Sequence, residues 1–342
     1  MTAPVIRNLL LAALLLPTSA AAQSAAQNAV PPQHNEATVA QLQAEMASGR
    51  LTSEHLTQEY ITRILALDQN GSGVNAIIEL NPDPLVMARN ADALRSRGVV
   101  LGPLHGIPVL LKDNIDTGDK MQTSAGSFAL VGMAALRDST VAANLRAGGA
   151  VILGKTNLSE WANFRSFESI SGWSGRGGQT HNPYGIDRNP CGSSSGSGAA
   201  ASANFATVSF GSETDGSIVC PANANGVVGI KPTVGLTSRA GVVPISHTQD
   251  TVGPHGRTVA DAAAALSVIQ SRSFDGRDPA TGGVPLGWQG TGKTRPKNIP
   301  TDYSKFVNPN ALQGARLGVT RVGLGGFDPN VPTPQSVLNA FE

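Results

Sequence analysis

Two segments of this sequence are rich in serine and glycine. The first is Gly192-Ser-Ser-Ser-Gly196, and the second is Gly211-Ser-Glu-Thr-Asp-Gly-Ser217. The small residues around Ser217 would let backbone N–H groups converge on a negatively charged oxygen, as acyl transfer requires. A serine hydroxyl attacks an amide carbon only if a base takes its proton. Each segment therefore has to be judged by the base available to it.

The first segment satisfies the G-x-S-x-G pattern of a nucleophile elbow, with Ser194 as the nucleophile. An esterase of this type also needs an acid and then a histidine further along the chain. Residues of both types follow the segment: Asp215, Asp250, His247 and His255. An elbow lies between a strand and a helix, yet residues 182–190 predict no strand. This esterase is kept as an alternative.

A lysine is the other possible base, and three lysines follow apolar runs: Lys112, Lys155 and Lys231. Lysine accepts a proton only when it is neutral, and its ordinary pKa makes the neutral form unfavourable by roughly 4 kcal/mol at pH 7. Burial lowers a lysine pKa and can remove most of that deficit. Residues 108–111 provide apolar surroundings for Lys112, but the residues alone do not choose among the three.

Residues 149–156 satisfy the phosphate-loop pattern G-x-x-x-x-G-K-[ST]. The four middle positions of a phosphate loop form a turn that exposes backbone N–H groups. Here these positions are Ala-Val-Ile-Leu, which predict a strand instead. The six histidines show no H-E-x-x-H or paired spacing, so we expect no metal and no other cofactor.

Five blocks together form a more specific pattern. They lie at residues 106–114, 154–162, 189–197, 211–221 and 226–235. In this order and at these separations they resemble the amidase signature family of hydrolases, and within it the bacterial peptide amidases. The resemblance covers roughly residues 37–325. It implies an amidase that forms a serine acyl-enzyme.

The resemblance also implies a role for individual residues. Ser217 is then the nucleophile, Ser193 is a relay residue held by a cis peptide bond, and Lys112 is the general base. Ser194 supports the relay. The oxyanion hole would consist of backbone N–H groups, namely those of Thr214, Asp215, Gly216 and Ser217.

Two positions depart from the commonest pattern of the family. Asp215 stands where glycine is more usual, and Val219 stands where arginine is more usual. The peptide amidases resemble this chain at both positions. We therefore expect the substrate to be a C-terminal peptide amide or a related small amide, hydrolysed with release of ammonia. The amidotransferases that modify tRNA-bound Glu or Asp share the blocks and are a third alternative. They work in the cytoplasm, however, whereas residues 1–22 of this chain predict export, as described below.

The elements that must position these residues are short apolar runs alternating with helical stretches. The runs lie at 107–111, 150–153, 205–210 and 226–230, and the helical stretches include 140–147 and 259–270. Such runs predict strands buried on both faces, hence an α/β fold whose mixed sheet is covered by helices on both faces. Thr38 and Gln41 form a capping-box signature before one N-terminal helix, and a second helix is expected from about Ser53.

The two ends of the sequence differ from its middle. Residues 1–22 combine Arg7, an apolar run and an A-x-A site, which predicts a secretory signal peptide and a periplasmic or secreted protein. Residues 23–36 are expected to be a flexible lead-in. Residues 37–342 then form the amidase signature domain, with a long surface excursion at 271–300 and a strand at 315–322. The helix that starts at Thr333 stops without a C-terminal signal, which predicts that the C-terminal part is missing.

Composition limits the partners. The chain has 342 residues, a net charge of +1 and scattered Lys and Arg, so neither nucleic acid nor an anionic membrane is expected. No later segment is long and apolar enough to span a bilayer. Export would permit a disulfide between Cys191 and Cys220, but two cysteines carry no spacing pattern, and the sequence leaves their pairing open. An inactive fragment or a binding module remains the rival to an enzyme.

Overall fold

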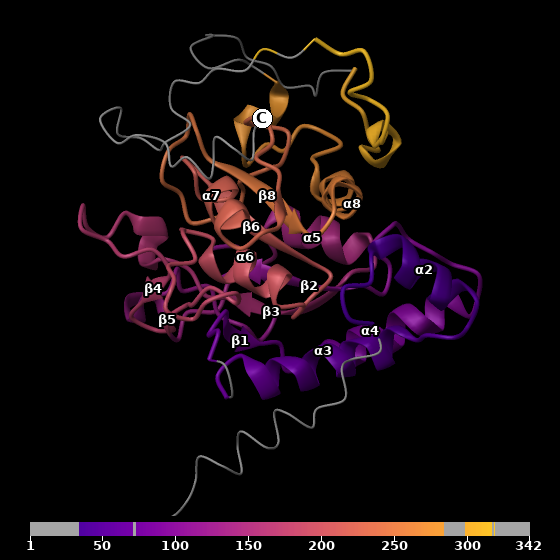
Figure 1. Ribbon diagram of the computed structural model, residues 1–342, viewed down its shortest axis with the longest axis horizontal. Helices are drawn as coiled ribbons and strands as arrows, with labels where there is room; N and C mark the ends of the chain where they lie inside the picture. Colours follow the sequence, from indigo (N-terminus) through magenta and orange to yellow (C-terminus); the bar gives the residue numbers. More distant parts are fainter. Residues whose placement is uncertain (1–33, 71–72, 284–297, 317, 319–342) are drawn as a thin grey trace, which may run out of the picture. The chain divides into compact units, whose positions relative to one another are not determined.

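A six-stranded sheet forms the centre of the larger of two units (Figure 1). The computed structural model describes residues 34–70, 73–283, 298–316 and 318. One unit ends at Ser304 and the other begins at Lys305. After the short 3-10 helix η4 (Ser304–Phe306), the described residues of the second unit form coil and turns.

The sheet is mixed, as the sequence predicted. Its strand order is β1-β3-β2-β6-β8-β7. β2 runs parallel to both β3 and β6, and the other pairings are antiparallel. The strands are β1 (Ile77–Leu80), β2 (Pro108–Lys112), β3 (Val151–Thr156), β6 (Val208–Glu213), β7 (Val228–Gly229) and β8 (Thr251–Gly256). A separate two-stranded sheet pairs β4 (Trp173–Ser174) with β5 (Gly178–Gln179).

Both faces of the sheet are covered. Successive side chains of a strand point to opposite faces, and every residue of β2, β3, β6 and β8 is buried. A sheet with one face in water would instead show alternating burial. The prediction of a sheet buried on both faces is therefore confirmed.

Seven helices surround the sheet in the described part of the chain. They are α2 (Val39–Ala47), α3 (Ser53–Leu67), α4 (Pro84–Arg95), α5 (Thr140–Ala147), α6 (Ser195–Ser202), α7 (Val219–Ala224) and α8 (Val259–Ile269). Helices α3 and α4 pack on each other and on β3, α6 packs on the central strands, and α8 packs on β8 (Figure 1). Short 3-10 turns are η1 (Phe128–Leu130), η2 (Glu160–Asn163) and η3 (Pro279–Gly282).

The N-terminal helices form as predicted. The Gln41 N–H donates to Thr38 Oγ1 over 3.2 Å, and the Thr38 N–H donates to Gln41 Oε1 over 2.8 Å. This reciprocal capping box satisfies two backbone donors that the first turn of a helix would otherwise leave free. The buried face of α3 includes Leu56, Tyr60 and Ile64.

The structure differs from the prediction at 271–283, the first part of the expected surface excursion. Asp278 and Thr281 are buried, because Asp278 pairs with Arg239 over 2.6 Å and Thr281 donates to the Asp278 carbonyl oxygen over 2.8 Å. Charged side chains that suggested a solvent-exposed loop are instead paired within the protein. The predicted signal peptide, nearly all of the lead-in, most of the strand at 315–322 and the helix from Thr333 lie outside the described residues. None of the described helices is both long and apolar enough to cross a bilayer.

Candidate functional site

Lys112 lies at the carboxyl end of β2 and is fully buried. Its Nζ contacts three oxygens: Ser193 Oγ at 2.7 Å, Ser212 Oγ at 3.0 Å and the Ser212 carbonyl oxygen at 3.1 Å. An ammonium group has three protons to donate, so all three are satisfied. When the amine is neutral, the carbonyl can still only accept, whereas either hydroxyl can donate to the free lone pair. The same contacts therefore suit both protonation states.

Burial lowers the pKa of Lys112 to about 7, because the charged form loses its hydration. Glu213 and Asp250 oppose part of this shift by favouring the positive charge. A large fraction of the amine is therefore neutral near pH 7. Lys112 has the property that the sequence analysis required of a general base.

Ser193 lies in the loop before α6, and its hydroxyl is completely buried against Lys112. The Gly192–Ser193 peptide bond is cis, which is the geometry that the family resemblance implied. The Ser193 carbonyl oxygen accepts a hydrogen bond of 3.0 Å from the Ser159 N–H. This hydrogen bond holds the backbone at the relay candidate.

Ser217 lies in the turn between β6 and α7 and is 7% exposed. Gly216 precedes it with φ +77°, in the left-handed region that glycine adopts without steric cost. Among the described residues, nothing forms a hydrogen bond with the Ser217 hydroxyl. The two serine loops are joined through the backbone, since the Ser194 N–H donates to the Ser217 carbonyl oxygen over 3.1 Å.

Ser194 is also buried, and it braces the lysine site rather than facing a base. Its hydroxyl donates to the Ser212 carbonyl oxygen over 3.0 Å and accepts from the Ser212 N–H over 3.3 Å. Ser212 in turn contacts Lys112, and it accepts a hydrogen bond of 2.8 Å from Asn114 Nδ2. Neither Ser212 nor Asn114 was singled out by the sequence analysis.

Glu213 is a further residue that the sequence analysis missed. It ends β6 and is buried, and its carboxylate accepts the N–H groups of Gly216, Ile218 and Val219 over 2.9, 2.7 and 2.9 Å. These bonds shape the turn that carries Ser217. The available signal was an acidic residue shortly before a helix, where backbone N–H groups favour negative charge.

The same contacts bear on the predicted oxyanion hole. The Gly216 N–H donates to Glu213 and is occupied. The N–H groups of Thr214, Asp215 and Ser217 have no hydrogen-bond partner in the part of the chain that the structure describes. Three of the four predicted donors are therefore free to bind an oxygen.

The alternative triad around Ser194 is not assembled. His247 is exposed, and the Nε2 of buried His255 bonds with the Ile218 carbonyl oxygen over 3.0 Å. Asp250 accepts from the Thr214 hydroxyl over 2.5 Å, and Asp215 is exposed. No histidine forms a hydrogen bond with Ser194 within the described residues.

The other two lysines are engaged elsewhere. Lys155 is buried in β3, and its Nζ donates to the Ile115 carbonyl oxygen over 2.6 Å and to Thr123 Oγ1 over 3.1 Å. Residues 151–156 form a strand, so the phosphate-loop pattern does not form a phosphate loop. Lys231 is partly exposed, with its Nζ 3.5 Å from the Gln249 carbonyl oxygen. Lys112 is the lysine that contacts a candidate serine.

Two cavities meet at Asn114, next to the lysine site. One has a volume of about 290 Å³ and is lined by Ser212, Thr214 and Asp250 among others. The other, of about 240 Å³, is lined by aromatic and apolar residues that include Trp161. Both share a wall formed by Val243, Pro244 and Ile245. A larger cavity of about 520 Å³ between α5 and α8 includes none of the candidate residues.

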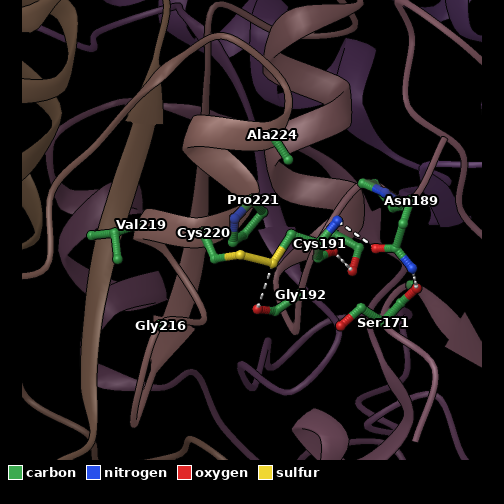
Figure 2. Close-up of a disulfide and its surroundings, with 12 residues drawn as sticks. Ser171, Asn189, Cys191, Gly192, Gly216, Val219, Cys220, Pro221 and Ala224 are labelled. Carbon is green, nitrogen blue, oxygen red and sulfur yellow. Dashed lines mark hydrogen bonds between the residues drawn. A yellow bond between two sulfur atoms is a disulfide. The ribbon is translucent and has the colours of Figure 1, made fainter. Parts of the chain in front are cut away.

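A disulfide joins Cys191 to Cys220 across the two serine loops, with their Cα atoms 5.8 Å apart. Figure 2 shows it between the loop before Ser193 and the start of α7, with Val219 pointing away from it. The structure thus answers the question of pairing that the sequence left open. Within the described residues, no three His, Cys, Asp or Glu side chains gather where they could hold a metal ion.

Comparisons with known proteins show that this chain is similar to amidases. The profile of the amidase family matches residues 55–300. A probable amidase of Arabidopsis thaliana is 48% identical over 301 residues, which cover 87% of this chain and 56% of that protein. A glutamyl-tRNA(Gln) amidotransferase chain of Symbiobacterium thermophilum is 39% identical over 295 residues, which cover 85% of this chain and 55% of that one.

The solved structures give the same result. The X-ray structure of native peptide amidase from Stenotrophomonas maltophilia matches with a TM-score of 0.72 and 58% identity, covering 75% of this chain and 52% of that one. The structure of an amidase family protein from Bacillus anthracis matches with a TM-score of 0.71 and 41% identity, covering 77% of this chain and 54% of that one. The chain spans about half the length of the relatives it matches.

Replacing Glu213 with glutamine tests whether its carboxylate holds the turn. Glutamine has a single acceptor oxygen, so its amide nitrogen would face at least one of the three N–H groups now bound. We expect Glu213→Gln to lower the free energy of unfolding by about 1–3 kcal/mol, because a buried donor loses its partner. Urea denaturation followed by circular dichroism measures this change. Glu168→Gln removes the same charge at an exposed position and should change stability little; equal losses in both variants would contradict the assignment.

Proposed function

Because the chain belongs to the amidase family, we propose that it hydrolyses carboxamide C–N bonds through an acyl-enzyme on Ser217. Lys112 is the general base and Ser193 relays the proton. The observation that carries the proposal is the buried Lys112 amine, 2.7 Å from the Ser193 hydroxyl and with its pKa lowered to about 7. A serine nucleophile needs such a base to take its proton as it attacks.

The first half of the reaction follows from these contacts. Ser193 passes its proton to Lys112 and takes one from Ser217 as the Ser217 Oγ attacks the amide carbon. The oxygen of the tetrahedral intermediate accepts hydrogen bonds from the free N–H groups of Thr214, Asp215 and Ser217. Each such donor typically contributes about 3 kcal/mol to lowering the barrier.

The second half returns the proton. Lys112 gives it back through Ser193 to the leaving nitrogen, which departs as ammonia or an amine and leaves an ester on Ser217. Water then attacks that ester with the same base, releasing the carboxylic acid and restoring the serine. Each residue ends the cycle in the protonation state in which it began.

We propose C-terminal peptide amides, or related small amides, as the substrates. Support comes from the peptide amidase of Stenotrophomonas maltophilia, which is 58% identical. The cavity lined by Ser212 and Thr214 adjoins the lysine contact and a proposed oxyanion donor, and it would take part of the substrate. The similarity to the amidotransferase is lower, at 39% identity, and the expected export signal disfavours work on tRNA.

Mass spectrometry of amidated peptides incubated with the full chain tests this activity. Hydrolysis adds about one dalton, because –NH₂ is replaced by –OH. We expect Ser217→Ala to lower kcat by a factor on the order of 10⁴ or more. Ser194→Ala, which removes only the two bracing hydrogen bonds to the Ser212 backbone, should lower it about tenfold. A larger loss of kcat in Ser194→Ala than in Ser217→Ala would instead favour the esterase with Ser194 as nucleophile. A cooperatively melting wild-type chain that hydrolyses no amide would instead favour a binding module.

The pH dependence gives a separate test of Lys112. Lysine acts as a base only when neutral, and its folded pKa is about 7. The kcat of the wild-type chain should therefore rise about tenfold per pH unit below pH 7 and level off above it. Initial rates between pH 5 and 9 would show this profile. A rate that is constant across that range would rule out a base with the pKa of Lys112.

We also propose that the chain is exported, because residues 1–22 have the n-region, apolar run and cleavage site of a signal peptide. Expression in a Gram-negative host should yield a periplasmic protein whose first residue is Gln23. N-terminal sequencing of the fractionated protein measures this. An intact Met1 on protein recovered from the cytoplasm would argue against export.

A further inference from the structure

The Cys191–Cys220 disulfide links the two loops that carry the proposed relay and nucleophile. Cys191 lies two positions before Ser193, and Cys220 lies three positions after Ser217. Figure 2 shows the crosslink between the Cys191 loop and the first turn of α7. Each cysteine is therefore within one short stretch of backbone of a reacting side chain.

Both loops are held tightly near the crosslink. The Cys191 N–H donates to Asn189 Oδ1 over 2.7 Å, and the Cys191 carbonyl oxygen accepts from Ser195 Oγ over 2.6 Å. On the other side, the Cys220 N–H donates to the Gly216 carbonyl oxygen over 2.8 Å. A change at either sulfur would therefore be transmitted to the backbone of the residues around it.

Between the two segments, the Ser194 hydroxyl exchanges two hydrogen bonds with the Ser212 backbone, at the end of β6, and two further hydrogen bonds lie closer to the crosslink. The Ser194 N–H bonds to the Ser217 carbonyl oxygen over 3.1 Å, and the Asn225 side chain reaches the Pro190 carbonyl oxygen over 2.9 Å. Among the described residues no hydrogen bond fixes the Ser217 hydroxyl itself. The alignment of the Ser217 hydroxyl with Ser193 thus depends on how the backbones of the two loops are positioned. The disulfide is the covalent link between those loops.

Proton transfer is sensitive to this alignment. A misplacement of about 1 Å at a reacting group can slow catalysis about 100-fold. Both cysteines are only partly buried, and partial exposure is what attack by a small thiol requires. We propose that the disulfide positions the relay against the nucleophile, and that full activity requires the oxidised pair. This inference rests on the proposed function.

The oxidised and reduced forms of the cysteine pair interconvert by thiol–disulfide exchange. A thiolate of a dithiol reductant attacks one sulfur and forms a mixed disulfide with the protein. The second thiol of the reductant then displaces the protein sulfur, leaving two cysteine thiols and the cyclic disulfide of the reductant. Two electrons and two protons pass to the protein. Oxidised glutathione reverses the change and is reduced to two glutathione molecules.

Steady-state kinetics of the full chain on an amidated peptide, before and after treatment with dithiothreitol, tests the proposal. The chain has only these two cysteines, so a thiol count reports their state directly. We expect reduction to lower kcat about 10- to 100-fold with little change in KM, and oxidised glutathione to restore it. Circular dichroism at the assay temperature must show that the reduced chain is still folded.

A variant with Cys191→Ser and Cys220→Ser serves as the matched control. Its kcat should equal that of the reduced wild type and should not respond to dithiothreitol. Equal kcat in the oxidised and fully reduced wild type would overturn the inference and leave the proposed function standing. Loss of activity only where the reduced chain unfolds would also overturn it, since the crosslink would then act on stability alone. An oxidised chain without amidase activity would count against the proposed function itself.

Discussion

A lysine amine buried without any carboxylate bonded to it is the feature on which the rest of this site depends. Moving an ammonium group out of water is costly, and three oxygen acceptors around Nζ compensate only in part, which is why the pKa of Lys112 falls to about 7. A carboxylate in direct contact would have held the charge and made the lysine useless as a base. Glu213 is close enough to act through space, but its oxygens are occupied by three backbone N–H groups.

The sheet supplies the geometry that this interaction needs. β2 and β6 are parallel neighbours, with Leu111 opposite Phe210, so their carboxyl ends reach the same edge. Lys112 therefore lies beside Ser212, and the chain leaves β6 into the turn that carries Ser217. The crossover from β3 to β6 contains the Ser193 loop and α6. Ligand sites of α/β sheets commonly lie at the carboxyl ends of parallel strands, and the same logic applies here.

Much of the fold was predictable because its signals are local. β2 is apolar up to Lys112 and β3 begins with three apolar residues, and the capping box at Thr38 is recognised from residues 38–41 alone. β8 was missed because its sequence contains Gly253, Pro254 and His255, which do not suggest a strand. The catalytic residues could be assigned only through family resemblance, since Lys155 is as deeply buried as Lys112 and only tertiary contacts distinguish them. Ser212 and the disulfide likewise depend on contacts that no spacing in the sequence reveals, whereas Glu213 carried one local signal, an acidic residue shortly before a helix.

The disulfide also encloses a covalent ring that runs from Cys191 to Cys220, a separation of 29 positions. Ser193, Ser194, Ser212, Glu213 and Ser217 all lie on this ring, whereas Lys112 and Asn114 lie outside it, at and just after the end of β2. Even in the unfolded chain, the serines remain within the small volume that such a ring can sample. Assembly of the site is then reduced to docking one closed loop against the end of β2.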